Sequence, residues 1–254
     1  MHLKASLWEG IYQSFEEVGG DHDAFDTDIW INKQKDKIQL DLNILKESTG
    51  SSRINTSKDY PLSLVVAMLL AQQGNISILD FGGGMGSQYL ELISKVPPAK
   101  DHVKYFVVDG KKTLDNTPRE MKAFSNLSFH ESLDEVEKKV DILHIGSALQ
   151  YIEDWKGLLF YLIEKFDPKY FVFSDLLVGD IPTFVSSQIF YDKKIPVKHY
   201  NTEDFRQHLE AKFHLLYKTF FSTEILGKNE LPNYSLPEKF RLKHSMNMIF
   251  KRRN

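Results

Sequence analysis

The sequence predicts an α/β fold in which a doubly wound, mostly parallel sheet is covered by helices on both faces. Two observations predict this fold. Short runs of β-branched and aromatic residues alternate with helix-length segments from about Tyr60 onward, and a glycine-rich turn follows the first of these runs. Alternation of this kind requires crossover connections, which make neighbouring strands parallel. Because ligands of such sheets bind beyond the carboxyl ends of the strands, we expect the functional site at that edge.

Five apolar runs are predicted as the parallel strands. They span residues 76–81, 104–108, 127–129, 141–145 and 170–174. The segments between them have helical length and span residues 87–96, 117–124, 133–138 and 155–166. A capped helix over residues 201–212 then precedes two closing strands, residues 215–221 and 246–251. The prediction is a seven-stranded sheet with an antiparallel C-terminal strand.

Residues 1–58 have a different character, because they are polar and charged with scattered apolar side chains. We interpret this part as an N-terminal helical cap and residues 59–254 as the α/β domain. Pro61 suits a first helical turn, and apolar residues at spacings of three and four predict a buried helix that ends near Gly74. The long stretch 222–244 between the two closing strands is either a functional lid or an irregular connection.

The composition excludes several classes of protein. The 254 residues contain 32 Lys and Arg against 35 Asp and Glu, a net charge of −3, whereas a nucleic-acid-binding protein needs a basic surface. The chain has no cysteine, which excludes disulfides, thiolate zinc sites, iron–sulfur clusters and a cysteine nucleophile. The most apolar run, residues 62–71, has about half the length of a membrane span. No secretory signal is visible, so we expect a cytoplasmic protein.

The glycine-rich turn is the most informative stretch. It consists of Asp80 at the end of a predicted strand, followed by Gly82, Gly83, Gly84 and Gly86. Glycine lets the backbone turn tightly and approach a ligand, and the helix that follows offers free N–H groups. A dinucleotide-binding turn requires a third glycine where Ser87 stands. The pattern acid-x-Gly-x-Gly-x-Gly fits instead, and it resembles the first motif of the class I S-adenosylmethionine-dependent methyltransferases.

This resemblance implies a Rossmann-like fold, S-adenosylmethionine as the cofactor, and further site residues. Asp109 ends the next predicted strand, where a carboxylate can accept hydrogen bonds from both hydroxyls of a ribose. The loop after the third strand, at Ser132, would touch the adenine. The loop after the fourth strand, with Ser147, Gln150 and Tyr151, would pass beneath the methionine part and face the acceptor. Asp80 would lie near the α-amino group of the cofactor.

A wider resemblance covers almost the whole chain. It rests on Trp8-Glu9-Gly10-Ile11-Tyr12, Ser14-Phe15-Glu16-Glu17, the turn at Asp80–Gly86, the run from Ala148 to Asp154, and Gln188 with Tyr191, Ile195 and Pro196. Together these segments resemble a family of bacterial methyltransferases associated with O-antigen and other surface-polysaccharide gene clusters. The resemblance implies a small polar acceptor, such as a sugar hydroxyl of a surface-polysaccharide precursor.

Methyl transfer from a sulfonium is an in-line displacement, which demands alignment of the reactants more than acid–base chemistry. A hydroxyl acceptor must also lose a proton, and His199, Asp175 and Tyr191 are the candidates to assist. His144 lies inside a predicted strand, where a core histidine bonded to a neighbour is the favoured interpretation. We predict no metal, because a metal site would need several acids at the ends of the fourth and fifth strands.

Two other functions agree with the same residues. One is an NAD-linked oxidoreductase. Ser87 counts against it, because a dinucleotide-binding turn requires glycine at that position. The other is a protein that binds S-adenosylmethionine without catalysing a reaction. We expect a small-molecule or glycan-precursor acceptor as the partner and no nucleic acid, and the sequence does not predict the oligomeric state.

Overall fold

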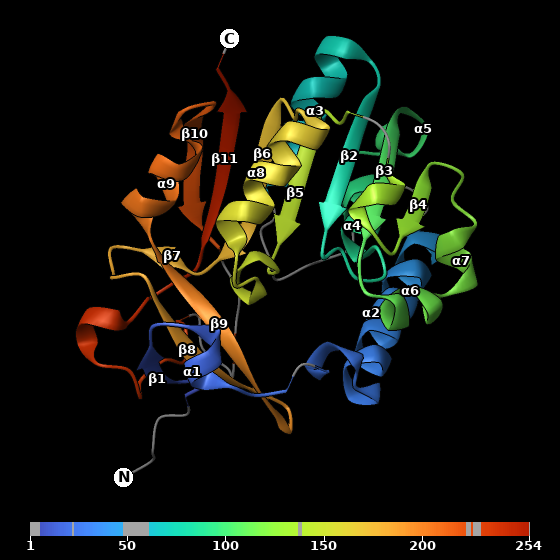
Figure 1. Ribbon diagram of the computed structural model, residues 1–254. Helices are drawn as coiled ribbons and strands as arrows, with labels where there is room; N and C mark the ends of the chain where they lie inside the picture. Colours follow the sequence, from blue (N-terminus) through green and yellow to red (C-terminus); the bar gives the residue numbers. More distant parts are fainter. Residues whose placement is uncertain are drawn as a thin grey trace.

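The computed structural model describes residues 6–21, 23–47, 61–136, 139–221, 225 and 230–253. Its main feature is a seven-stranded sheet with the order β10-β11-β6-β5-β2-β3-β4 (Figure 1). The strands are β2 (Ile76–Phe81), β3 (Val103–Val108), β4 (Leu127–His130), β5 (Ile142–Gly146), β6 (Tyr170–Leu176), β10 (Phe213–Phe220) and β11 (Met246–Arg252). The five neighbouring strands β6, β5, β2, β3 and β4 pair in parallel, and β11 runs antiparallel to both of its neighbours, β6 and β10. The predicted fold class is confirmed.

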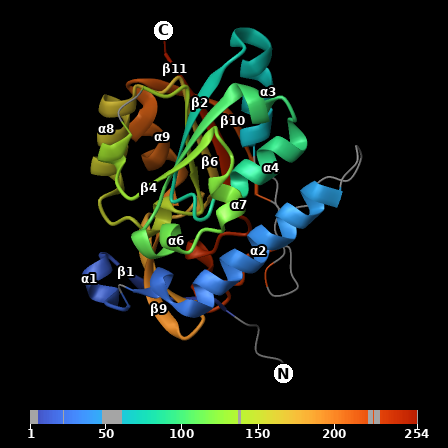
Figure 2. The same cartoon turned by 90° about the vertical axis from the view of Figure 1, so that its right-hand side faces the viewer.

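The two faces of this sheet bury two separate hydrophobic cores, because side chains alternate along each strand. In β6, for example, Phe171 and Phe173 lie in one core and Val172 lies in the other. Helices α8 and α9 cover the first face, whereas α2, α3 and α4 cover the second (Figure 2). Burial on both faces explains why the central strands have nearly continuous apolar sequences.

Helices connect most of the parallel strands as the alternation predicts, but between β4 and β5, where a helix over residues 133–138 was predicted, the described residues form only a 3-10 turn. The longer ones are α2 (Asp28–Glu47), α3 (Leu62–Gln73), α4 (Ser87–Lys95), α8 (Trp155–Phe166) and α9 (Thr202–Glu210). The short ones are α1 (Phe15–Val18), α5 (Ala99–His102), α6 (Lys111–Asp115) and α7 (Arg119–Lys122), with 3-10 turns η1 (Ala24–Asp26), η2 (Leu133–Glu135), η3 (Leu149–Tyr151) and η4 (Glu238–Phe240). Among the described residues, no helix has both the length and the apolar character that crossing a membrane requires.

A second, four-stranded sheet was not predicted from the sequence. Its order is β1-β8-β9-β7, from β1 (Trp8–Tyr12), β7 (Val178–Gly179), β8 (Phe184–Phe190) and β9 (Lys193–Asn201). Strands β8 and β9 form an antiparallel hairpin, and β1 adds to the outer edge of β8. Figure 1 shows this small sheet below the carboxyl ends of the parallel strands. It therefore stands beside the edge where a ligand of the large sheet would bind.

The N-terminal part divides between the two sheets. The predicted helical cap contains a strand as well as helices, because Trp8–Tyr12 pairs with the hairpin. Helix α2 instead buries Ile31, Ile38 and Leu42 in the same core as α3 and α4. The predicted boundary between residues 58 and 59 lies outside the described residues, as does most of residues 222–229.

Candidate functional site

The glycine turn connects β2 to α4 at the position where the strand order reverses, between β3 and β5. Gly82, Gly84 and Gly86 have φ angles of 68°, 60° and 84°, a backbone conformation that residues other than glycine rarely adopt. The turn also packs closely on its neighbours. A Cβ on Gly82 would lie 2.5 Å from Cβ of Ala148, in the loop after β5. Both conformation and space therefore require glycine here.

Asp109 joins the end of β3 to this turn. Its Oδ2 accepts the N–H of Gly84 at 2.7 Å, and its Oδ1 accepts the N–H of Gly110 at 2.7 Å. Burial raises the pKa of this carboxyl above its ordinary value of 3.8, and the two N–H groups oppose the shift. The structure thus brings together the two elements that the sequence predicts to hold a nucleoside.

Asp80 lies below the turn in the protein interior, with only 1% of its surface exposed. Its Oδ2 accepts the hydroxyl of Tyr105 at 2.7 Å, and its Oδ1 lies 2.7 Å from Nδ1 of His144. Nε2 of His144 lies in turn 3.1 Å from Oγ of Ser174. The chain of bonds crosses β3, β2, β5 and β6, and it supports the turn from beneath.

This network bears on the expectations for His144 and Asp80. The expectation that His144 is a core histidine bonded to a neighbour is confirmed. Both oxygens of Asp80 have partners within the protein, so its role near the cofactor amino group stays a prediction. Burial and the charge of Asp80 raise the pKa of Tyr105 well above its ordinary value, and the phenol remains a donor.

The ends of β5 and β6 carry a second polar group, centred on Asp175. Ser147 and Asp175 both have φ of 54°, a strained conformation for residues with side chains. Oγ of Ser147 donates to Oδ2 of Asp175 at 2.6 Å, and Oγ of Ser245 donates to Oδ1 at 2.5 Å. Strain of this kind persists where the surrounding structure fixes a functional geometry. Ser245, which precedes β11, carried no signal in the sequence.

Gln150 and Tyr151 lie in η3, next to this group. Gln150 is 4% exposed, and its Nε2 lies 3.5 Å from the carbonyl oxygen of Asp175. Within the part of the chain that the structure describes, Oε1 of Gln150 has no hydrogen-bond partner although it is buried. Tyr151 donates to Oε1 of Gln188 at 3.1 Å, and burial and the charge of Asp175 raise its pKa. A buried acceptor without a partner indicates a place for a donor group.

Three other predicted site residues lie apart from this group. His199 is 1% exposed in the small sheet, where its ring stacks on Phe184 with centroids 4.4 Å apart. Burial lowers the pKa of His199 to about 3, so the imidazole is neutral near pH 7. Ser132 accepts the N–H of Asp134 as the N-cap of η2. Tyr191 lies at the tip of the β8–β9 hairpin with 39% of its surface exposed.

An aromatic cluster connects η1, α2, η3 and the hairpin. Its members are Phe25, Trp30, Tyr151, Phe190 and Tyr191. The rings of Phe25 and Tyr151 have centroids 4.9 Å apart, and those of Trp30 and Phe190 are 5.2 Å apart. The sequence did not predict this cluster, because its members come from segments far apart in the chain. It places apolar ring surface beside the polar group at Asp175.

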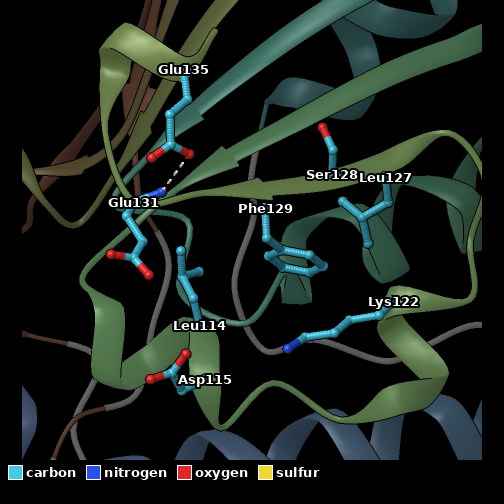
Figure 3. Close-up of a pocket in the computed structure, with 8 residues that line it drawn as sticks. All are labelled: Leu114, Asp115, Lys122, Leu127, Ser128, Phe129, Glu131 and Glu135. Carbon is cyan, nitrogen blue, oxygen red and sulfur yellow. Dashed lines mark hydrogen bonds between the residues drawn. The ribbon is translucent and has the colours of Figure 1, made fainter.

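A hollow of about 430 Å³ lies between β4 and helices α6 and α7 (Figure 3). Apolar side chains of Leu114, Leu127 and Phe129 line it together with charged groups of Lys122 and Glu131. The Phe129 ring also lies beside the turn, since its Cζ is 3.4 Å from the position of a Cβ on Gly86. The hollow thus adjoins the loop that the sequence predicts to touch adenine.

No family model and no curated protein matches this sequence. Solved structures do match the fold. Magnesium protoporphyrin IX methyltransferase from Synechocystis PCC 6803, with bound S-adenosylhomocysteine, is 15% identical with a TM-score of 0.52. A chain from the complex of the Haloferax volcanii Trm112 methyltransferase activator with a methyltransferase is also 15% identical, with a TM-score of 0.51. Each match covers 91% of this chain and 97% of the other.

These similarities concern the fold. The chain has the Rossmann-like fold of class I methyltransferases, with its glycine turn at the point where the strand order reverses. Among the described residues, no group of three or more His, Asp or Glu side chains is arranged to hold a metal ion.

Proposed function

We propose that this protein is an S-adenosylmethionine-dependent methyltransferase that acts on a small polar acceptor. The observation that carries the proposal is the bond from Gly84 N–H to Asp109, which joins a glycine turn to a carboxylate at the strand-order reversal. This position is where doubly wound sheets bind nucleosides. The fold similarity to methyltransferase structures supports the same conclusion.

The residues present fit the cofactor. The glycines of the turn present no side chains, so its backbone can approach a ligand closely. Asp109 would accept hydrogen bonds from the ribose, and the hollow beside Phe129 offers apolar surface for the adenine. When bound, the cofactor supplies an electrophilic methyl group on a sulfonium.

The group around Asp175 would receive the acceptor. Asp175 can take the proton of an acceptor hydroxyl, because the hydroxyls of Ser147 and Ser245 hold its carboxylate in one orientation. The unpartnered Oε1 of Gln150 can accept a second donor group of the same molecule. His199 is buried in the small sheet, and this location favours Asp175 over His199 as the base.

For the acceptor itself we propose a sugar hydroxyl of a cytoplasmic surface-polysaccharide precursor. Two acceptor groups, Asp175 and Gln150, suit a compound rich in hydroxyl donors, and the nearby aromatic cluster suits the apolar face of a ring. The resemblance to methyltransferases of surface-polysaccharide gene clusters supports this choice.

Replacing Asp109 by alanine tests the cofactor assignment. We expect the Asp109→Ala protein to bind S-adenosylhomocysteine about 10- to 100-fold more weakly by calorimetry, because hydrogen bonds to a charged group contribute about 1.5–3 kcal/mol. The fold should persist, because the two N–H groups that lose their acceptor belong to Gly84, which is half-buried, and to Gly110, which is exposed, and neither lies in the core. Unchanged affinity in a folded variant would contradict the assignment.

The same carboxylate predicts a pH dependence of binding. Ribose hydroxyls donate to the charged form, and protonation removes that acceptor. Affinity for S-adenosylhomocysteine should therefore fall as the pH is lowered through the Asp109 pKa, which burial holds above 3.8. The Asp109→Ala protein should show a flatter profile over the same range in parallel titrations.

A panel of candidate acceptors tests the substrate class. We expect release of S-adenosylhomocysteine with nucleotide sugars or glycan intermediates and a loss of that release in Asp175→Asn, which keeps the shape of the side chain but is a poor base. Methylation confined to hydrophobic or protein acceptors would show that the acceptor proposal is wrong. Stabilisation by NAD but not by S-adenosylhomocysteine in a melting experiment would favour an oxidoreductase instead.

A further inference from the structure

Helix α2, which belongs to the predicted N-terminal cap, packs next to the glycine turn of the proposed cofactor site. Its apolar face, with Ile31, Ile38 and Leu42, is buried in the core that also contains Met85 of the glycine turn. In Figure 2 the helix runs past α4, α6 and α7 on the side that faces the viewer. Its polar side chains next to the buried face are therefore placed close to the turn.

One of these side chains, Gln34, reaches the glycine turn itself. Its amide oxygen, Oε1, is the atom nearest to the position of a Cβ on Gly84, and it lies too close for that carbon to fit without the side chain moving. Gly84 is the residue whose N–H bonds to Asp109, so Gln34 and Asp109 contact the same residue of the turn from different directions. Gln34 is half-buried, and within the described part of the chain its amide forms no hydrogen bond.

Contacts at both ends hold this part of α2 in place. Lys112 of α6 bonds to Oδ1 of Asp28 at 3.1 Å, and Lys35 donates to Oδ1 of Asn116 at 2.7 Å. On the other side, Nζ of Lys33 lies 4.4 Å from the ring centroid of Tyr191. The amide of Gln34 is therefore presented to the turn by an element that is fixed to α6 and to the hairpin.

We infer that Gln34 contacts the bound cofactor at its charged amino-acid end, an inference that rests on the proposed function. An amide can accept a bond from an ammonium and donate one to a carboxylate. Asp80, the sequence-based candidate for the ammonium, has only 1% of its surface exposed and bonds to Tyr105 and His144 in the core, whereas Asp109 is half-buried. The amide of Gln34 lies at the surface of the turn, where it can reach the cofactor, whereas the carboxylate of Asp80 points into the core.

Calorimetry of S-adenosylhomocysteine binding tests this inference with matched variants. Gln34→Ala should weaken binding about 10- to 100-fold, the range for lost bonds to charged groups. Gln39→Ala is the control, because Gln39 is exposed on the same helix and, among the described residues, its side chain bonds only to Asn43. It should bind as the unmodified protein does, and both variants should melt at similar temperatures because alanine favours helices.

A second ligand locates the contact. 5′-Methylthioadenosine keeps the nucleoside and the sulfur but lacks the amino-acid end, so Gln34→Ala should leave its affinity unchanged. Equal affinity of Gln34→Ala and the unmodified protein for S-adenosylhomocysteine would overturn the inference, as would an equal loss for both ligands. Failure of the unmodified protein to bind S-adenosylhomocysteine would overturn the proposed function instead.

Discussion

Replacing Asp80 by alanine should lower the free energy of unfolding by about 2–6 kcal/mol, because two buried donors each lose their acceptor at about 1–3 kcal/mol. The variant leaves the Tyr105 hydroxyl and Nδ1 of His144 in the interior without their acceptor, and both residues are fully buried. It also removes the side chain beneath Gly83, since Oδ2 of Asp80 is 2.6 Å from the position of a Cβ there. Urea unfolding measures the loss.

Ser174→Ala provides the comparison for this result. Ser174 is the outer member of the same network, and within the described part of the chain its hydroxyl has one partner, Nε2 of His144 at 3.1 Å. Its removal should cost about 1 kcal/mol, the net value of one hydrogen bond. If the two variants lose similar stability, Asp80 does not organise the network and the carboxylate has another role.

Replacing Gly84 by valine should abolish measurable binding of S-adenosylhomocysteine while most of the fold persists. A branched side chain at φ of 60° is strained by about 1–3 kcal/mol, and its methyl groups would occupy the space between the turn and α2. The nearest atom is the end of the Gln34 side chain, which can move, so the core need not rearrange. Binding should weaken more than 100-fold, roughly 3 kcal/mol.

Gly74→Val separates strain from position. Gly74 follows α3 with φ of 77°, and apart from its chain neighbours no atom of the described residues lies within 4 Å of the position of its Cβ. This variant carries similar backbone strain away from the site, so it should lose comparable stability and bind S-adenosylhomocysteine normally. Normal binding by Gly84→Val would mean that the turn does not hold a ligand.

The sequence predicted the parts of this protein that depend on local signals. Apolar runs identified β2 to β6, and the glycines at alternate positions identified the turn, because each feature is determined by a few neighbouring residues. The small sheet was missed because its strands pair across long separations. Alternation of Ile195, Val197 and His199 along β9 was the available signal, and it would have placed His199 in the interior.

The site residues follow the same division. Asp80 and Asp109 each end a recognisable strand, so the sequence located them, although it did not indicate that the Asp80 side chain points into the core. Gln34 and Ser245 have no distinguishing neighbours in the sequence. Gln34 comes close to Gly84 through the packing of α2, and Ser245 comes close to Asp175 because it directly precedes β11.

The pairing of β1 with β8 has a consequence for biosynthesis. Trp8 pairs with Gln188, so β1 has no partner strand until residues near 188 have been synthesised. Closing so long a loop is slow compared with forming the neighbouring parallel units. Strands β2 to β6 of the larger sheet can begin to assemble during translation, whereas the small sheet, with the Gln188 partner of Tyr151, can add β1 only after β8 has been made. A nascent chain would thus acquire its cofactor-binding edge before its acceptor side.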